Sequence, residues 1–294
     1  MKRLLLAVAI VAFAATATAQ ASKFESGADE VIVYWDNATA PHSNNDTAAE
    51  EYYITETGSV RFTRSNETVF YLFKAQNPTG HSVAIFPGGG YKNVNVGFSV
   101  AKWLSQNGIT AMVVKYRLPN GVREVPIEDA GAAIAYLRNN AARLGIDPNK
   151  VGVNGSSAGG HLAAWTSNIM ADEEKPAFAI PLYGSMVRTE FYAGNKANYA
   201  LLGEDFTWQD AIDWSSQNMV TPNTPPTLLF LCDDDKVVLP YSSVVYYEAL
   251  LRHGVKASMH IFPFGGHSVK KHEAEYHPLI LDWLRYLGLI NEEK

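Results

Sequence analysis

The residues best suited to chemistry form the pattern Gly-x-Ser-x-Gly at positions 155–159, with Ser157 at its centre. An apolar run precedes the pattern and a helical run follows it, so the serine falls on a sharp turn between a strand and a helix. Such a turn exposes the serine oxygen, and the start of the helix directs its amides and dipole towards developing negative charge. This context favours Ser157 as a nucleophile, whereas the neighbouring Ser156 is out of register by one residue.

A serine nucleophile at such a turn needs an acid and then a histidine further along the chain. The strand expected at 227–231 leads into three aspartates, and the segment Asp-x-Val-Val before a proline turn favours Asp235 over Asp234 as the orienting acid. After the last expected strand, Pro-Phe-Gly-Gly-His at 263–267 places His267 on a glycine-rich loop. One ring nitrogen of His267 can then contact Ser157 while the other contacts Asp235.

Acyl transfer also needs backbone amides that stabilise an oxyanion. The strand expected at 83–86 ends in Pro-Gly-Gly-Gly-Tyr at 87–91, and glycines let a backbone approach the reacting atoms without interference from a Cβ. A tight or flexible loop would also tolerate three glycines, but the position of this loop favours the catalytic interpretation. The amide of Ala158, next to the nucleophile, is expected to be the other donor.

Other reactive side chains are expected to be structural. His161 follows the nucleophile on its helix and precedes the acid, and Cys232 follows an apolar strand, which favours a buried small residue. His272 and His277 fall at the start of a helix and are expected at the surface. The sequence contains no H-E-x-x-H or C-x-x-C pattern and no phosphate-binding loop, so neither a metal site nor a cofactor is expected.

The candidate catalytic residues follow different expected strands, so the fold must bring the ends of these strands together. Apolar runs alternate with helical patterns, which predicts an α/β fold with a mainly parallel central sheet flanked by helices. Residues 51–64 are expected to form an antiparallel strand pair, and the aromatic-rich stretch 184–216 a short cap over the carboxyl edge of the sheet. Strands are predicted at 69–73, 83–86, 111–116, 151–154, 178–182, 227–231 and 257–262, and helices at 96–107, 126–144, 159–170, 242–253 and 273–287.

Length and composition are those of a globular protein. The chain has 294 residues, of which 47% are hydrophobic and 18% charged, and these values exclude a disordered or fibrous protein. A net charge of −6 makes nucleic acid and anionic membranes poor partners. The single cysteine excludes a disulfide within the chain.

The first twenty residues have the layout of a cleavable secretory signal. Lys2 and Arg3 precede an apolar stretch that is too short to span a bilayer comfortably, and two A-x-A sites follow it. We therefore expect residues 1–20 to be removed and the protein to be exported, periplasmic or extracellular, without a membrane anchor. No linker or repeat divides residues 21–294, which are expected to form a single catalytic domain.

The motifs together resemble the α/β-hydrolase family that contains secreted bacterial acetylxylan esterases and related carbohydrate esterases. The resemblance covers most of the chain after the signal. It implies catalytic roles for Ser157, Asp235 and His267, with Gly89, Gly90 and Ala158 around the oxyanion. It is carried by residues 40–44, 87–91, 155–163, 201–203, 224–227, 234–238, 246–250 and 265–267.

Two positions depart from the pattern of these esterases. The family often carries His-x-Gly-Ser where residues 195–199 stand here, and it often continues Gly-Gly-His-Gly where this chain has Ser268. Both departures fall close to the expected substrate site, so they concern the sugar that is recognised and not the three catalytic residues.

The resemblance implies a serine carboxylesterase that removes acetyl or similar acyl groups from xylan or other plant polysaccharides. A peptidase of the prolyl oligopeptidase type shares the order of catalytic residues, but the long N-terminal propeller region of such enzymes is not expected here. A catalytically inactive binding protein is a third hypothesis, although such proteins usually lose one catalytic residue. Aromatic residues are expected either to line the sugar site or to pack the cap; these are Tyr91, Tyr183 and Trp208, and also Phe191, Tyr192, Tyr199, Phe206 and Trp214.

Overall fold

The structure, a computed structural model, describes residues 26–189 and 196–290. The predicted signal peptide at 1–20 lies outside the described residues, as do Phe191 and Tyr192 of the predicted cap. Among the helices of the described ranges, none is both long and apolar enough to cross a membrane.

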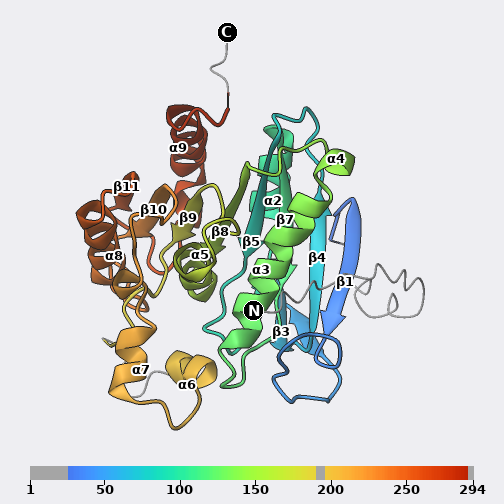
Figure 1. The fold of residues 1–294 in the computed structure, drawn as a ribbon, viewed down its shortest axis with the longest axis vertical. Coiled ribbons are helices and arrows are strands. Elements are labelled where there is room, and N and C mark those ends of the chain that lie inside the picture. Colours follow the sequence, from blue (N-terminus) through green and yellow to red (C-terminus); the bar gives the residue numbers. More distant parts are fainter. Residues whose placement is uncertain (1–25, 190–195, 291–294) are drawn as a thin grey trace, which may run out of the picture.

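A central sheet organises the molecule. Its strands are β1 (Glu30–Asp36), β4 (Glu67–Phe73), β5 (His81–Phe86), β7 (Ile109–Lys115), β8 (Val151–Ser156), β9 (Ala179–Leu182), β10 (Thr227–Cys232) and β11 (Ala257–Phe262). They lie in the order β1-β4-β7-β5-β8-β9-β10-β11 (Figure 1). From β7 to β11 neighbouring strands are parallel, whereas β4 pairs antiparallel with both β1 and β7. The predicted α/β-hydrolase fold with a mainly parallel sheet is confirmed.

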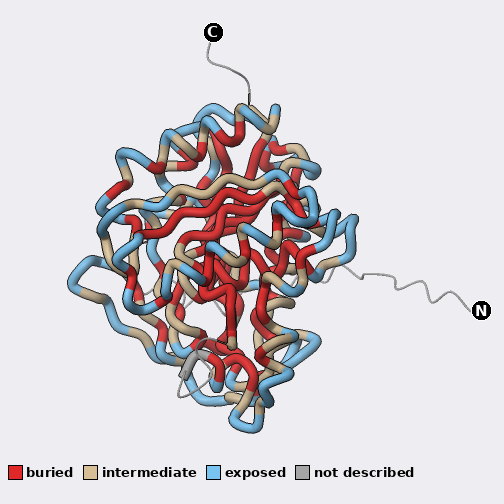
Figure 2. Tube along the Cα trace, turned by 90° about the vertical axis from the view of Figure 1, so that its left-hand side faces the viewer, coloured by how far each residue is buried: buried red, intermediate tan, exposed pale blue. Residues whose placement is uncertain are grey.

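Helices cover both faces of this sheet. On one face lie α2 (Ser99–Gln106) and α9 (Glu273–Tyr286), where the Trp103 and His277 rings stack with centroids 4.0 Å apart. On the other lie α3 (Glu124–Asn139), α5 (Ala158–Ile169) and α8 (Tyr241–Arg252). Every residue of β5, β7 and β10 is therefore buried, and Figure 2 shows the sheet as a buried band between more exposed layers.

Some elements differ from the sequence-based expectations. Residues 51–64 do form a hairpin, of β2 (Glu51–Ile54) and β3 (Val60–Arg64), but it pairs with β6 (Val94–Val96) in a separate three-stranded sheet. Because residues 94–96 are used as a strand, the helix expected at 96–107 begins only at Ser99. The helix expected at 126–144 breaks at Asn140 into α3 and the short α4 (Ala141–Leu144). Strand β1 was not predicted.

The connection from β9 to β10 forms the cap at the carboxyl edge of the sheet. It contains α6 (Lys196–Leu202), α7 (Trp208–Asp213) and the 3₁₀ turn η2 (Ser216–Asn218), and α6 and α7 lie below the sheet in Figure 1. A reciprocal capping box between Thr207 and Asp210 starts α7. A second 3₁₀ turn, η3 (Lys270–His272), precedes α9.

Candidate active site

Ser157 lies on the turn between β8 and α5. Its backbone has φ 55° and ψ −119°, a conformation that L residues rarely adopt and that turns the side chain out of the sheet. The Ser157 amide donates to the Leu182 carbonyl at 2.9 Å, which ties the turn to β9. Close packing requires glycine at position 159, because a Cβ there would lie 1.9 Å from the carbonyl oxygen of Phe86.

The structure brings Ser157, His267 and Asp235 into one hydrogen-bonded chain. His267 Nε2 lies 2.8 Å from Ser157 Oγ, and His267 Nδ1 lies 2.7 Å from Asp235 Oδ2. A carboxylate only accepts, so Nδ1 carries the ring proton and Nε2 is left to accept the serine proton. This geometry is that of a nucleophile, a general base and an orienting acid.

The Asp235 carboxylate is buried and held by backbone amides. Its Oδ1 accepts from Val237 at 2.8 Å and Val238 at 3.0 Å, which leaves Oδ2 for His267. The neighbouring Asp234 is exposed and accepts from the Gly266 amide at 2.7 Å. This hydrogen bond lowers the pKa of Asp234. The two aspartates therefore contact the histidine loop in different ways, Asp235 at the ring and Asp234 at the backbone.

The glycine loop at 87–91 lies directly beside the nucleophile, since a Cβ on Gly88 would be 3.1 Å from Ser157 Cβ. Hydrogen bonds hold its carbonyl groups: the Tyr116 hydroxyl donates to Pro87 at 2.8 Å, and the Asn95 amide donates to Gly88 at 2.9 Å. Because these acceptors are occupied, the loop is oriented with little freedom to turn.

The amides predicted to stabilise an oxyanion are available for that purpose. In the part of the chain that the structure describes, neither the Gly89 nor the Gly90 amide donates to another protein group. Ala158 is the first residue of α5, where a helix leaves amides without acceptors of its own. Ala158 directly follows Ser157, and Gly89 and Gly90 follow Gly88, which packs against Ser157. The role of the three amides in stabilising an oxyanion stays a prediction.

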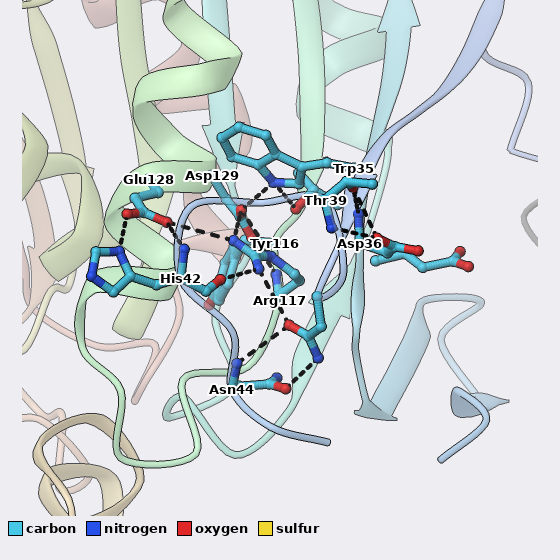
Figure 3. A network of polar contacts seen from close by, with 12 residues as sticks. Trp35, Asp36, Thr39, His42, Asn44, Tyr116, Arg117, Glu128 and Asp129 are labelled. Carbon is cyan, nitrogen blue, oxygen red and sulfur yellow. Dashed lines mark hydrogen bonds and ion pairs between the residues drawn. The ribbon is translucent and has the colours of Figure 1, made fainter. Parts of the chain in front are cut away.

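A buried polar network supports the strand end that carries Tyr116 (Figure 3). Arg117 and Asp129 are both fully buried and form an ion pair, with Nη2 and Oδ1 2.7 Å apart. Trp35 Nε1 donates to the same carboxylate at 2.7 Å, and Arg117 Nη1 donates to the carbonyl of His42 at 2.7 Å. The network therefore holds the segment around residues 40–44 against the end of β7.

Of the three residues predicted to contact substrate, Tyr91 is a correction. Its side chain is only 1% exposed, and its hydroxyl contacts His161 at 2.8 Å inside the molecule. It follows the glycine loop closely, but the backbone at Tyr91, with φ 59°, directs the ring into the core. Trp208 is exposed at the start of α7, and a contact of Trp208 with substrate stays a prediction.

Tyr183 lies beside His267, where its ring packs against the imidazole. The two rings meet edge to face with centroids 5.0 Å apart. Ser156, Tyr183 and Ser268 line one cavity, and burial raises the pKa of Tyr183. Ser268, one of the departures from the family pattern, thus lines the same cavity as the aromatic ring that packs against His267.

Two residues behind the histidine loop belong to its support. His272 was expected at the surface, which is wrong: it is 4% exposed, and its Nε2 donates to the Phe264 carbonyl at 2.6 Å. Cys232 is buried, as expected, and its Sγ lies 3.3 Å from the Ser268 carbonyl oxygen. No local sequence motif predicts the burial of His272, because its hydrogen-bond partner, the Phe264 carbonyl, lies in a loop before the helix.

The site is therefore equipped for nucleophilic attack by a serine on an acyl carbon. Within residues 26–189 and 196–290, no three His, Cys, Asp or Glu side chains are grouped so that they could hold a metal ion.

The chain is similar to known esterases in sequence. The BD-FAE family model matches residues 70–250, more than half of the chain. An acetylxylan esterase of Xylanibacter ruminicola is 33% identical over 202 residues, 66% of this chain and 42% of that protein. Endo-1,4-beta-xylanase B of Butyrivibrio fibrisolvens is 26% identical over 201 residues, 63% of this chain and 32% of that protein. The chain thus spans less than half the length of these two relatives.

Solved structures extend the likeness to the fold. An acetyl ester-xyloside bifunctional hydrolase of Caldicellulosiruptor lactoaceticus superimposes with a TM-score of 0.73 at 28% identity, covering 89% of this chain and 97% of that chain. The carboxylesterase Cest-2923 of Lactobacillus plantarum superimposes with a TM-score of 0.67 at 22% identity, covering 84% of this chain and 100% of that chain. At this identity the second similarity bears on the fold alone.

Proposed function

The chain belongs to the BD-FAE family of α/β-hydrolases, and from this premise we propose that it is a serine carboxylesterase acting on acylated carbohydrate. Its proposed reaction removes acetyl or similar acyl groups from xylan or other plant polysaccharides and their oligosaccharides. The observation that carries the proposal is the hydrogen-bonded chain from Ser157 through His267 to Asp235, beside a glycine loop. The names of the acetylxylan esterase and the acetyl ester-xyloside hydrolase support the substrate class.

The mechanism follows from the positions of these groups. His267 Nε2 takes the proton of Ser157, whose oxygen attacks the ester carbonyl and forms a tetrahedral intermediate. The amides of Gly89, Gly90 and Ala158 stabilise its oxyanion. The intermediate collapses as the sugar alcohol leaves with the proton from His267. Water, activated by the same histidine, then releases the acid from Ser157.

Acetate release tests the proposal directly. Acetylated xylan and a peptide 4-nitroanilide are incubated with wild-type protein and with Ser157→Ala, and acetate and nitroaniline are measured. We expect acetate from wild type alone and no cleavage of the amide. If short acyl esters are cleaved while the polymer stays acetylated, the proposed serine esterase activity is retained but the proposed carbohydrate substrate is wrong.

A fluorophosphonate probe tests the nucleophile independently of the substrate. Wild type and Ser156→Ala should be labelled, and Ser157→Ala should not, because it is the Ser157 hydroxyl that lies 2.8 Å from His267 Nε2. An unlabelled wild-type protein would overturn the serine mechanism.

We also propose that the protein is exported. The charged start, short apolar stretch and A-x-A sites within residues 1–21 support this location. Fractionation of producing cells, with N-terminal sequencing of the exported protein, should find a chain that begins near residue 21; a cytoplasmic protein that retains residue 1 would contradict export.

A further inference from the structure

A buried cation lies in the cap behind the glycine loop. Arg188 is 1% exposed, and in the described part of the chain no carboxylate pairs with it and its Nη2 has no hydrogen-bond partner. Its amide donates to Ser215 Oγ at 2.8 Å, and its Nη1 donates to Asn198 Oδ1 at 3.2 Å. Burying an arginine without a carboxylate is unfavourable unless other groups stabilise the charge. The groups that face its guanidinium therefore need an explanation.

Those groups are Tyr91 and His161. The Arg188 guanidinium lies over the Tyr91 ring, 5.4 Å from its centroid, which is the geometry of a cation–π contact. Its Nε lies 3.3 Å from His161 Nε2. The cap is thereby joined through Arg188 to Tyr91, the last residue of the glycine loop, and to His161 on α5.

Tyr91 and His161 also bind each other. Tyr91 Oη and His161 Nδ1 are 2.8 Å apart, and both side chains are buried. Tyr91 directly follows Gly90, and His161 lies one helical turn beyond Ser157, whose carbonyl accepts from the His161 amide at 3.0 Å. The Tyr91–His161 bond therefore connects the two chain segments that supply the predicted oxyanion donors.

The bond persists whichever ring nitrogen of His161 carries the proton. Its Nε2 lies 3.3 Å both from Arg188 Nε, which only donates, and from the Trp214 carbonyl oxygen, which only accepts. In either tautomer the Tyr91 hydroxyl can take the complementary role, since a hydroxyl both donates and accepts. Burial and the neighbouring Arg188 lower the pKa of His161 well below its usual value, so the ring stays neutral.

We propose that Tyr91 and His161 are positioning residues, which hold the Gly89 and Gly90 amides at the distance from Ser157 and Ala158 that the oxyanion requires. Arg188 stabilises the pair and couples it to the cap. The inference rests on the proposed esterase function. Displacing the loop by an ångström weakens donors that act mainly in the transition state, so kcat should fall while KM changes little.

The first test compares two buried tyrosines. Tyr91→Phe removes the hydroxyl that contacts His161, whereas Tyr246→Phe removes an equally buried hydroxyl, 3.3 Å from Asn168 Oδ1 at the far end of α5. With 4-nitrophenyl acetate, we expect kcat to fall about 10–100-fold in Tyr91→Phe and less than about twofold in Tyr246→Phe. Thermal unfolding of both variants measures the stability cost that they share.

The second test compares two substitutions of the same buried histidine, which differ in where the side-chain amide lies. In His161→Asn the amide lies where Nδ1 was and can still bind Tyr91; in His161→Gln it lies near the Nε2 position and cannot. We expect His161→Asn to retain kcat within about threefold and His161→Gln to resemble Tyr91→Phe. Inhibition by a trifluoromethyl ketone, whose serine adduct carries the same oxyanion, should weaken in parallel with kcat/KM.

The outcomes separate the two proposals. Equal kcat values for Tyr91→Phe and Tyr246→Phe, or for His161→Asn and His161→Gln, would overturn the positioning role. So would a loss of kcat without weaker inhibition by the ketone. A wild-type protein that neither hydrolyses esters nor reacts with fluorophosphonate would instead overturn the proposed function, before any variant is compared.

Discussion

Two adjacent carboxylates contact the histidine loop through different atoms. Asp235 is buried and binds the ring nitrogen of His267, while the exposed Asp234 binds the amide of Gly266. Both contacts place an acceptor opposite a donor, but only the first controls which nitrogen of the base carries its proton. Asp235 therefore fixes the position of the His267 ring proton, whereas Asp234 supports the loop backbone. Mutation of each aspartate separates these two effects.

We expect Asp235→Asn to lower kcat by about 10³–10⁴-fold. An amide at position 235 can donate to Nδ1, which favours the tautomer whose Nε2 carries a proton and cannot accept one from Ser157. In Asp234→Asn the amide oxygen still accepts from Gly266, so kcat should change by less than about tenfold. Steady-state hydrolysis of 4-nitrophenyl acetate measures both, and equal losses would contradict the assignment of the acid.

Sequence motifs predict those site residues whose motif lies within one short segment of the chain. Ser157, Asp235 and His267 each follow a recognisable strand end, and the structure brings all three together. Tyr183 and His272 carry no such motif. Tyr183 packs against His267, which is distant in sequence, and His272 binds the carbonyl of Phe264 on an irregular loop, so only the folded chain shows these contacts.

The histidine loop shows how an element depends on its packing. Gly265 has φ 146°, and a Cβ there would lie 2.6 Å from Cys232 Sγ and 2.8 Å from the Ser268 carbonyl oxygen. Gly266, the next residue, has φ 67° and nothing within 4 Å of such a Cβ. Both glycines thus have positive φ, but only at Gly265 would a Cβ clash with neighbouring atoms.

We therefore expect Gly265→Ala to displace His267 and lower kcat by about 100-fold. Gly266→Ala should cost about 1 kcal/mol of folding free energy from backbone strain, with kcat nearly retained. Urea unfolding and ester hydrolysis of the two variants give the comparison. A Gly265→Ala protein with wild-type kcat would show that the loop tolerates the shift.

Strands are predicted correctly from the sequence where burial on both faces makes every residue of the strand part of an apolar run. The strands β5, β7 and β10 are buried along their whole length and show as apolar runs. Strand β1, at the edge of the sheet, has mixed exposure, and β6 has three residues. Both depend on pairing with distant segments, as does the second sheet to which the hairpin at 51–64 belongs. Such pairings leave little trace in a local pattern.

At the scale of the whole molecule, the Arg117–Asp129 pair joins three separate segments. It connects the end of β7 with α3, and through Trp35 and the His42 carbonyl it holds the segment that follows β1. Both charges are fully buried, and the only other carboxylate paired with Arg117 in the described residues, Glu128, lies 3.9 Å from Nη2. The pair therefore contributes to keeping the N-terminal part of the chain attached to the sheet.

We expect Asp129→Ala to lower the free energy of unfolding by about 3–5 kcal/mol, because the buried Arg117 loses its closest counter-charge and keeps only Glu128, 3.9 Å away. The control is Glu30→Gln, which breaks a partly exposed pair with Arg143 and should cost less than about 1 kcal/mol. Urea denaturation followed by tryptophan fluorescence measures both. Similar losses in the two variants would show that burial of the network adds little.

A buried histidine makes the stability of the whole chain depend on pH. His81 begins β5, is 1% exposed, and contacts the Thr79 hydroxyl through Nδ1 at 3.0 Å. Its Nε2 has no partner in the described ranges. Burial and the charge of Lys150 lower the pKa of His81 to about 4, against about 6.5 in an unfolded chain.

Between these two pKa values the unfolded chain binds a proton at His81 that the folded chain does not. The free energy of unfolding is therefore highest above about pH 6.5 and falls as the pH drops towards 4, by about 2–3 kcal/mol from this residue. In His81→Asn we expect most of this slope to disappear, whereas His253→Asn, at the exposed end of α8, should keep it. Urea unfolding at pH 7, 5.5 and 4.5 measures the slope, and an unchanged slope in His81→Asn would assign the acid sensitivity to other groups, such as the buried His161.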